Sequence, residues 1–114
     1  MPDASTQGAV FVQTNEVQNA VVAFRRHADG SLEELGSFAT GGVGQGEPHL
    51  PSQGSVVLTG DGTRLLVTNS GGDDVTTFTV EPSGGLDVVG RSAAGQAPTS
   101  VAECDGLVYV LTTG

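Results

Sequence analysis

An internal repeat is the feature of this sequence that most constrains its fold. Five pairs of residues share one offset of 54 positions. These pairs are Asn15 and Asn69, Phe24 and Phe78, Gly30 and Gly84, Leu32 and Leu86, and Gly36 and Gly90. A second echo, at 44 to 45 positions, links residues 54–58 with 99–103 and Asp61-Gly62 with Asp105-Gly106. Such self-similarity is typical of proteins built from stacked supersecondary units. The sequence therefore predicts a repeat architecture.

The pattern of apolar residues predicts an all-β chain. Nowhere do they follow the i, i+3, i+4, i+7 spacing of a helix, whereas short β-branched runs recur between clusters of Gly, Asp and Asn. The expected strands are residues 9–14, 20–25, 32–38, 54–59, 65–69, 75–80, 86–92, 100–104 and 107–111. The dipeptides that accept the positive φ of tight turns are Asp29-Gly30, Asp61-Gly62, Gly84-Gly85 and Asp105-Gly106. Neighbouring strands should therefore be antiparallel.

The repeating unit has the size of a propeller blade. Four strands in about 44 residues are typical of the blades of a β-propeller. We expect four-stranded antiparallel meanders, with a partial blade at 9–41, a complete blade at 54–95 and a second partial blade at 99–114. Residues 1–114 would then form a partial β-propeller, an incomplete ring in one chain. The larger of the two offsets places about ten extra residues in 42–53, which we expect to be a loop without a strand.

Charge and composition exclude several classes of partner. Thirteen acidic residues face four basic ones, all Arg, which gives a net charge of −9 and disfavours nucleic acid. The single Cys104 excludes an intrachain disulfide. Neither a long apolar segment nor a secretory signal is visible, so no membrane partner is expected. We expect a soluble chain, with the cytoplasm as its default location.

One segment of the sequence resembles the blade of a known family. Leu65-Leu-Val-Thr-Asn69 and Asp74-Val-Thr-Thr-Phe-Thr-Val80, preceded by the segment 54–62, are similar to blades of the lactonase-type seven-bladed propellers. That family includes 6-phosphogluconolactonases and carboxymuconate cyclases, and the resemblance extends over almost the whole chain. The sequence departs from the pattern at Thr112, where the blade has Asn, and at Thr59-Gly60, where Ser-Pro is usual.

The resemblance implies a ring that one chain cannot close. Seven blades at this repeat length need roughly 300 residues or more, and the chain has 114. Three copies would supply about 27 strands, close to the roughly 24–28 strands of six or seven blades. We therefore expect the chain to have itself as partner, in a homo-oligomer such as a trimer. A truncated product, an engineered fragment or one piece of a cleaved protein are the alternatives.

The resemblance also implies a candidate site in the loop 46–53. Its Pro48-His49 pair resembles one that the family carries in the same connection, so Glu47 and His49 would face the central channel with Gln53 beside them. A carboxylate and an imidazole can polarise water or transfer a proton during the opening of a lactone. The alternative is that the two prolines only stiffen the loop and that its polar groups bond its own backbone.

Arg64 is the second candidate for ligand binding. It is expected either to bind the carboxylate or phosphate of a small sugar acid or lactone, or to serve as a solvated partner of Asp61. Asp73-Asp74 does not match the alternating ligands of a calcium loop. Asn15 and Asn69 are interpreted as turn-building residues. No motif of serine hydrolases, zincins, NTPases or redox proteins occurs, so we expect neither a metal nor a cofactor.

Two functions remain open from the sequence. The favoured one is a non-catalytic propeller fragment or module that assembles with other copies into a closed ring. The other is a lactonase-like hydrolase of the 6-phosphogluconolactonase type, whose site is completed by oligomerisation or by missing blades. A propeller is a scaffold that hosts many activities, so the fold alone does not decide between them.

Overall fold

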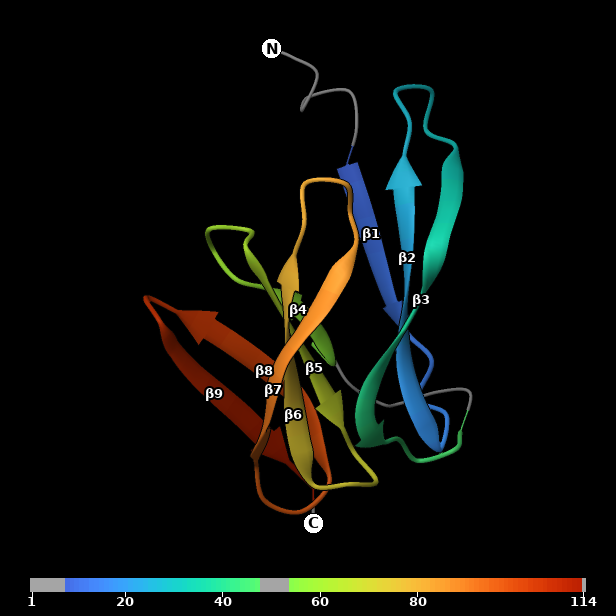
Figure 1. The fold of residues 1–114 in the computed structure, drawn as a ribbon. Coiled ribbons are helices and arrows are strands. Elements are labelled where there is room, and N and C mark those ends of the chain that lie inside the picture. The colour runs from blue at the N-terminus through green and yellow to red at the C-terminus, as the bar shows by residue number, and fades with distance from the viewer. Residues whose placement is uncertain (1–7, 48–53, 114) are drawn as a thin grey trace.

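The structure, a computed structural model that describes residues 8–47 and 54–113, consists of three antiparallel sheets (Figure 1). The first sheet has the strand order β1-β2-β3, the middle sheet β4-β5-β6-β7, and the last sheet β8-β9. The strands are β1 Gly8–Gln13, β2 Gln18–Arg26, β3 Leu32–Val43, β4 Val56–Leu58, β5 Arg64–Asn69, β6 Asp74–Val80, β7 Leu86–Ala93, β8 Pro98–Cys104 and β9 Leu107–Thr112. No helix that could cross a membrane occurs among the described residues. The prediction of an all-β chain of antiparallel meanders without a closed ring is confirmed.

The strand β3 is longer than the sequence indicates. We expected it to end at residue 38 and a loop to occupy 42–53, but β3 continues to Val43. Gln18 pairs with Val43, and a register shift between Gln18 and Ala20 keeps the two strands in step. The beginning of the predicted loop was therefore wrong, because glycines that look like a connection are tolerated in a strand that is paired and bulged.

The tight turns adopt the backbone that their dipeptides require. Gly30, Gly62, Gly84 and Gly106 all have φ between 73° and 94°. Of these four turn dipeptides, only that of the β8–β9 turn has positive φ at both residues, with Asp105 at 52°. This combination is the one that a two-residue hairpin of type I′ needs, and it matches the right-handed twist of the strands.

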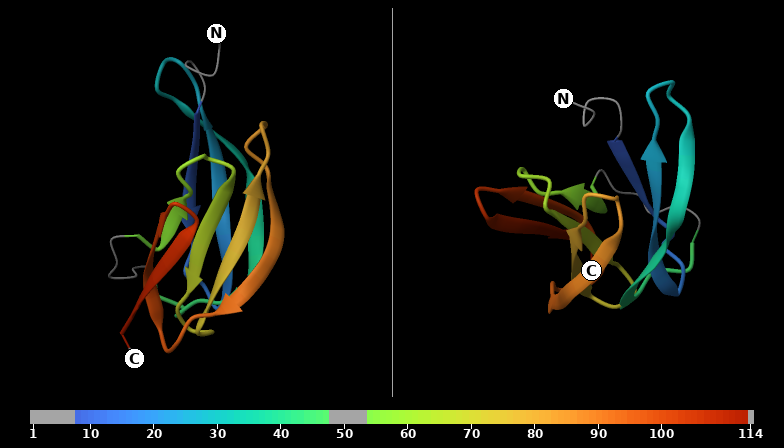
Figure 2. Two further views of the ribbon diagram at one scale, coloured as in Figure 1. Left: turned by 90° about the vertical axis from the view of Figure 1, so that its left-hand side faces the viewer. Right: turned by 45° about the horizontal axis from the view of Figure 1, so that its top comes forward.

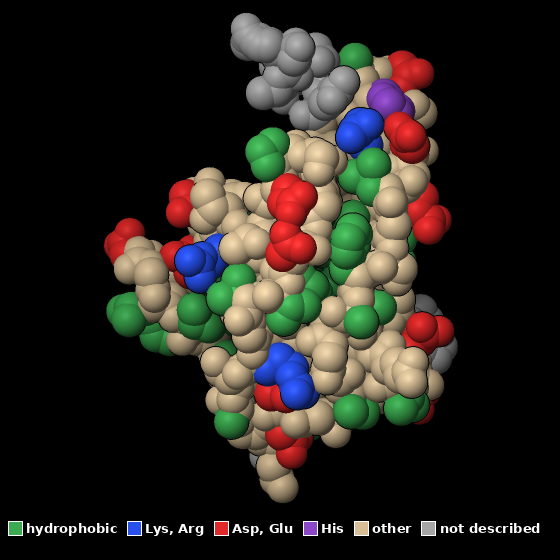
Figure 3. Space-filling model, in the orientation of Figure 1, with side chains coloured by type: hydrophobic (Ala, Val, Ile, Leu, Met, Phe, Trp, Pro, Cys, Tyr) green, Lys and Arg blue, Asp and Glu red, His purple; other side chains and the backbone are tan. Residues whose placement is uncertain are grey.

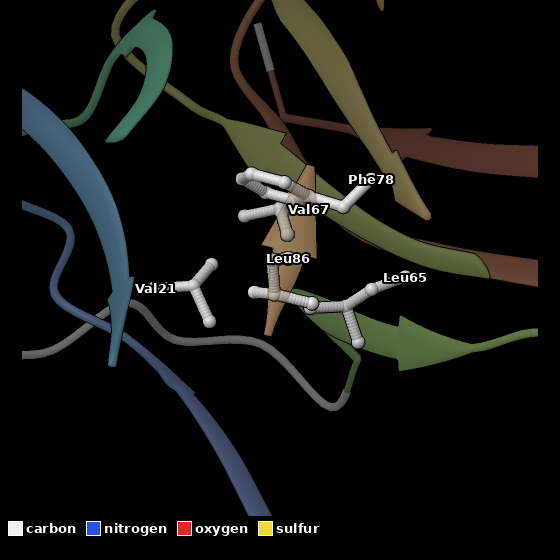
Figure 4. Packing of buried hydrophobic residues seen from close by; sticks show 5 residues of the cluster. All are labelled: Val21, Leu65, Val67, Phe78 and Leu86. Atoms are coloured by element: carbon white, nitrogen blue, oxygen red, sulfur yellow. The ribbon is translucent and has the colours of Figure 1, made fainter. Parts of the chain in front are cut away.

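The middle sheet is covered on both faces, as Figures 1 and 2 show. Successive side chains of β5 point to opposite faces, so Leu65 and Val67 face the first sheet while Leu66 faces the last sheet. Val21 of β2 and Phe78 of β6 complete the centre of the first cluster, where the side chains point toward one another (Figure 4). Burying each of these side chains contributes roughly 1.5–3 kcal/mol, so the two apolar layers hold the three sheets together.

The backbones of the first and middle sheets come into contact at one end, where β3 and β5 finish. Gly71 N donates a hydrogen bond to Val43 O at 2.9 Å, which joins the two sheets through their backbones. A Cβ on Gly42 would overlap the side chain of Asn69, and one on Gly71 would overlap Gly44 O. Glycine is required at both positions because of this close approach.

We predict that Gly42→Ala destabilises the fold by about 1–3 kcal/mol, because the added methyl group must displace a buried amide that is fixed by hydrogen bonds. Gly90→Ala is the matched control, since Gly90 also lies in a strand and a Cβ there meets nothing within 4 Å. The free energies of unfolding in urea measure both. Equal stabilities of the two variants would contradict the close packing described above.

Candidate functional site

The polar side chains at the end of β5 form a buried cluster between the first and middle sheets. Asn69 is fully buried, and its Oδ1 accepts hydrogen bonds from Asn19 Nδ2 at 2.9 Å and Thr40 Oγ1 at 2.8 Å. Its Nδ2 donates to Asp74 Oδ1 at 2.7 Å and to Thr76 Oγ1 at 2.9 Å. The amide thus uses all its hydrogen-bonding capacity within the protein, and its orientation is fixed.

Further hydrogen bonds extend the cluster across the two sheets. Asn19 Nδ2 also lies 3.2 Å from Thr68 O, and Thr76 Oγ1 donates to Thr40 O at 3.0 Å. Each buried polar group left without a partner would cost about 1–3 kcal/mol. The Asn69 cluster therefore fixes how the first sheet sits on the middle sheet, and its hydrogen bonds leave no obvious group to act on a ligand.

The two neighbouring acids Asp73 and Asp74 have separate partners. Asp74 forms an ion pair with Arg91 at 3.2 Å, whereas Asp73 Oδ1 accepts a hydrogen bond from Ala97 N at 2.9 Å. In residues 8–47 and 54–113 there is no group of three or more His, Cys, Asp or Glu side chains that could hold a metal ion. These acids position the sheet and the connection that follows it.

The connection after β3 folds back onto the turn between β1 and β2. Asn15, at a positive φ of 56°, is the centre of this contact. Its Oδ1 accepts from Gln45 N at 3.0 Å, its carbonyl accepts from Gly46 N at 2.9 Å, and its Nδ2 donates to Glu47 O at 3.2 Å. Asn15 therefore builds a turn, as its sequence position suggests. Its repeat partner Asn69 has an additional role, because it joins two sheets. The repeat alone did not indicate this role.

Glu47 is the only one of the loop's three candidate site residues that lies in the described part of the chain. Its side chain is exposed at the rim of a shallow hollow of about 410 Å³, together with Thr14, Glu16 and Val17. His49 and Gln53 lie outside the described residues. The hollow brings a second carboxylate, that of Glu16, to the same rim, and this proximity was not anticipated from the sequence.

Arg64 lies at the other end of the sheets from Glu47. It begins β5, whereas Asn69 ends it, and five residues of strand span roughly 17 Å. Glu47 O binds Asn15 at the same end as Asn69, as the course of β1 and β5 in Figure 1 shows. The ion pairs of the described residues are Arg25 and His27 with Glu33, and Arg91 with Asp74. The structure therefore does not bring Arg64 and Glu47 into one site.

The turn beside Arg64 is organised by Asp61. One oxygen of this carboxylate accepts hydrogen bonds from Thr63 N at 3.0 Å, Thr63 Oγ1 at 2.8 Å and Thr59 Oγ1 at 2.7 Å. The backbone N–H of Thr63 first, and then the two hydroxyl groups, lower the pKa of Asp61 to about 2. In the turn between β2 and β3, the hydroxyl group of Ser31 first, and then its backbone N–H, lower the pKa of Asp29. These perturbed carboxyl groups stabilise turns.

Comparison with known proteins gives one match. A sequence model of the family described as Lactonase, 7-bladed beta-propeller, matches residues 4–110. No curated protein and no solved structure matches the chain significantly. The match covers all the described strands except the end of β9.

The low pKa of Asp61 predicts a specific dependence of stability on pH. The carboxylate is favoured in the folded state, so its contribution is fully present above the ordinary value of 3.8 and is lost as the pH falls toward about 2. We expect Asp61→Asn to reduce the loss of unfolding free energy between pH 4 and pH 2. Urea unfolding over this range, with the carboxyl titration followed by NMR, measures the effect. The control Asp105→Asn removes a charge from the turn between β8 and β9. It should lose as much unfolding free energy between pH 4 and pH 2 as the parent chain does.

Proposed function

Because the chain belongs to the lactonase family of seven-bladed β-propellers, we propose that it is a propeller module that associates with further copies of itself to complete a ring. The observation that carries this proposal is the unequal size of the three sheets. Only the middle sheet has four strands. Among the described residues, the first sheet lacks a counterpart of β4, and the last sheet lacks counterparts of β6 and β7.

Incomplete sheets favour association because they leave backbone groups and apolar surface uncovered. The outer edge of β1 and the outer edge of β9 have no strand beside them in the described structure. Exposed strand edges are templates for pairing, and proteins normally cover them. Repeat proteins likewise need terminal units with polar outer faces when they remain monomeric. The exposed Leu107, Tyr109 and Leu111 of β9 do not provide such a face.

A non-catalytic role is supported by the distribution of the candidate site residues. Glu47 and Arg64 lie at opposite ends of the sheets, and the perturbed carboxyl groups of Asp29 and Asp61 serve turns. A catalytic site requires its groups within hydrogen-bonding reach of one substrate. A cytoplasmic location, expected from the sequence, is part of this proposal.

The proposal predicts a concentration-dependent mass in light scattering. A ring built from three copies would have three times the mass of the chain. Each copy carries a net charge of −9, so copies repel one another and the repulsion is screened by salt. The oligomer should therefore be more populated at about 0.5 M than at about 0.01 M salt, where the Debye length is about 30 Å. A monomer at every concentration and salt would refute the proposal.

A lactonase-like activity is the second candidate function, and the family match favours it. Glu47 and His49 would act as the proton-transferring pair, and Gln53 and Arg64 would bind a sugar acid or lactone. If the assembled protein hydrolyses 6-phosphogluconolactone, His49→Ala and Glu47→Gln should each lower the rate by about 100-fold or more. Arg25→Gln, which changes a surface ion pair, serves as control. A rate equal to that in buffer would eliminate this candidate.

A further inference from the structure

The last sheet presents an uncharged, largely apolar face to solvent. The register places Ala102 opposite Tyr109, and Leu111 lies two residues farther along the same side. The alternate pair, Val101 with Val110, packs against the middle sheet. Because side chains alternate between faces, Ala102, Tyr109 and Leu111 lie on the outer face. Hydrophobic side chains gather over this hairpin in Figure 3. A groove of about 1000 Å³ beside it is lined by Ala102, Tyr109 and Leu111, and also by residues of the alternate side and by Glu103.

The corresponding face of the middle sheet is covered. On this face Val57 is opposite Leu66, just as Ala102 is opposite Tyr109 in the last sheet. The repeat of 54–58 in 99–103 aligns the two hairpins. Leu66 is 4% exposed because β8 packs over it, whereas Tyr109 is 60% exposed. The outer face of the last sheet is therefore one half of an inter-sheet interface whose other half is not supplied by the described residues.

The first sheet presents the complementary half. Val10 is opposite Phe24, and Val12 is opposite Val22, whereas Phe11 lies on the alternate side and packs in the core. These four side chains consequently lie on the outer face of the first sheet, where Arg26 and Glu34 flank them. Val12 is exposed, and the other three are partly buried.

The internal repeat shows that this outer face corresponds to the face of the middle sheet that is buried under the first sheet. Leu32 and Leu86 are repeat partners, as are Phe24 and Phe78. Leu86 and Phe78 are 6% and 0% exposed under the first sheet, whereas Leu32 is 53% exposed. One chain thus carries both halves of the interface that it forms between its own sheets, at opposite ends of the stack.

We propose that the outer face of the last sheet in one copy docks on the outer face of the first sheet in the next copy. This inference rests on the proposed function and specifies a contact through the faces of the sheets. The contact keeps the three sheets of each copy separate and does not involve the edges of β1 and β9. The occupant of each face is a second copy, since the contact continues the interface that already stacks the middle sheet between its neighbours. The two surfaces differ, so the association is head-to-tail and produces a ring if the rotation closes.

The interface between copies is weaker than the one within the chain. Inside the chain, Asn19 of β2 donates to Asn69 of the next sheet. The last sheet has no counterpart of β2 in the described structure, and the repeat partner Asn15 is already bound to Gln45 and Glu47. The contact between copies therefore has no counterpart of this buried amide pair, and apolar packing must hold the copies together against the repulsion of their charges.

Charge insertions on each face test the inference by complementation. Tyr109→Glu destroys the face of the last sheet, and Val12→Glu destroys the face of the first sheet. Each variant alone should be monomeric under conditions in which the parent chain associates. A mixture of the two should form a heterodimer that stops growing, because each variant retains the face that the other has lost. Leu111→Glu and Leu32→Glu provide second variants for the two faces.

Val89→Glu is the matched control, since Val89 is 53% exposed on β7 of the middle sheet. It should associate as the parent chain does. If the parent chain associates and the four face variants form assemblies of the same mass, the proposed interface is wrong while the proposed function stands. Monomeric variants whose mixture stays monomeric would also overturn the head-to-tail contact. A monomeric parent chain would remove both proposals.

Cys104 provides a measurement that requires no substitution in the parent chain. It is exposed and lies opposite Leu107 on the outer face of the last sheet. Its reaction with a maleimide should slow as the concentration of the parent chain rises, in proportion to the fraction bound. In Tyr109→Glu and Val12→Glu the rate should not depend on concentration. A parent chain that associates without protecting Cys104 would contradict the proposed contact.

Discussion

The buried amide of Asn69 is the contact on which the arrangement of the first two sheets depends. Apolar packing of the first sheet on the middle sheet is not directional and would tolerate sliding. Asn69 removes that freedom, because its four hydrogen bonds reach both sheets and its amide cannot turn without leaving buried groups unpaired. The glycines around it follow from the same contact, since Gly42 must leave room for the amide.

The sequence predicted the parts of this fold that local chemistry determines. Turn dipeptides and β-branched runs located the strands, because positive φ and alternation are properties of adjacent residues. The sequence did not predict the partners of Asn69, since Asn19 and Thr40 are distant along the chain and reach it only when two sheets stack. The end of β3 was missed for a similar reason: pairing with Gln18 outweighs a Gly-rich composition.

The same limit applies to the candidate site. The resemblance to lactonase blades implied a role for Glu47, and the basic side chain of Arg64 suggested ligand binding; both are exposed, as ligand-binding side chains can be. Their separation follows from strand direction: one lies where β5 begins, and the other lies beside the turn that Asn15 builds. Sequence spacing does not reveal which end of a meander a residue occupies until the direction of every strand is assigned.

Charge placement explains how so acidic a chain can still stack sheets. Asp29, Asp61 and Asp105 lie in turns, and Glu81 and Asp87 flank another, where a hydrogen bond and the like charge of Asp87 raise the pKa of Glu81. The repulsion of these groups thus acts at the ends of the strands, where water screens it, and the outer face formed by Ala102, Tyr109 and Leu111 carries no charge. A face without charge can bury another face in the same chain or in a neighbour. The charges at the strand ends therefore oppose association, while the uncovered faces determine where the contact forms.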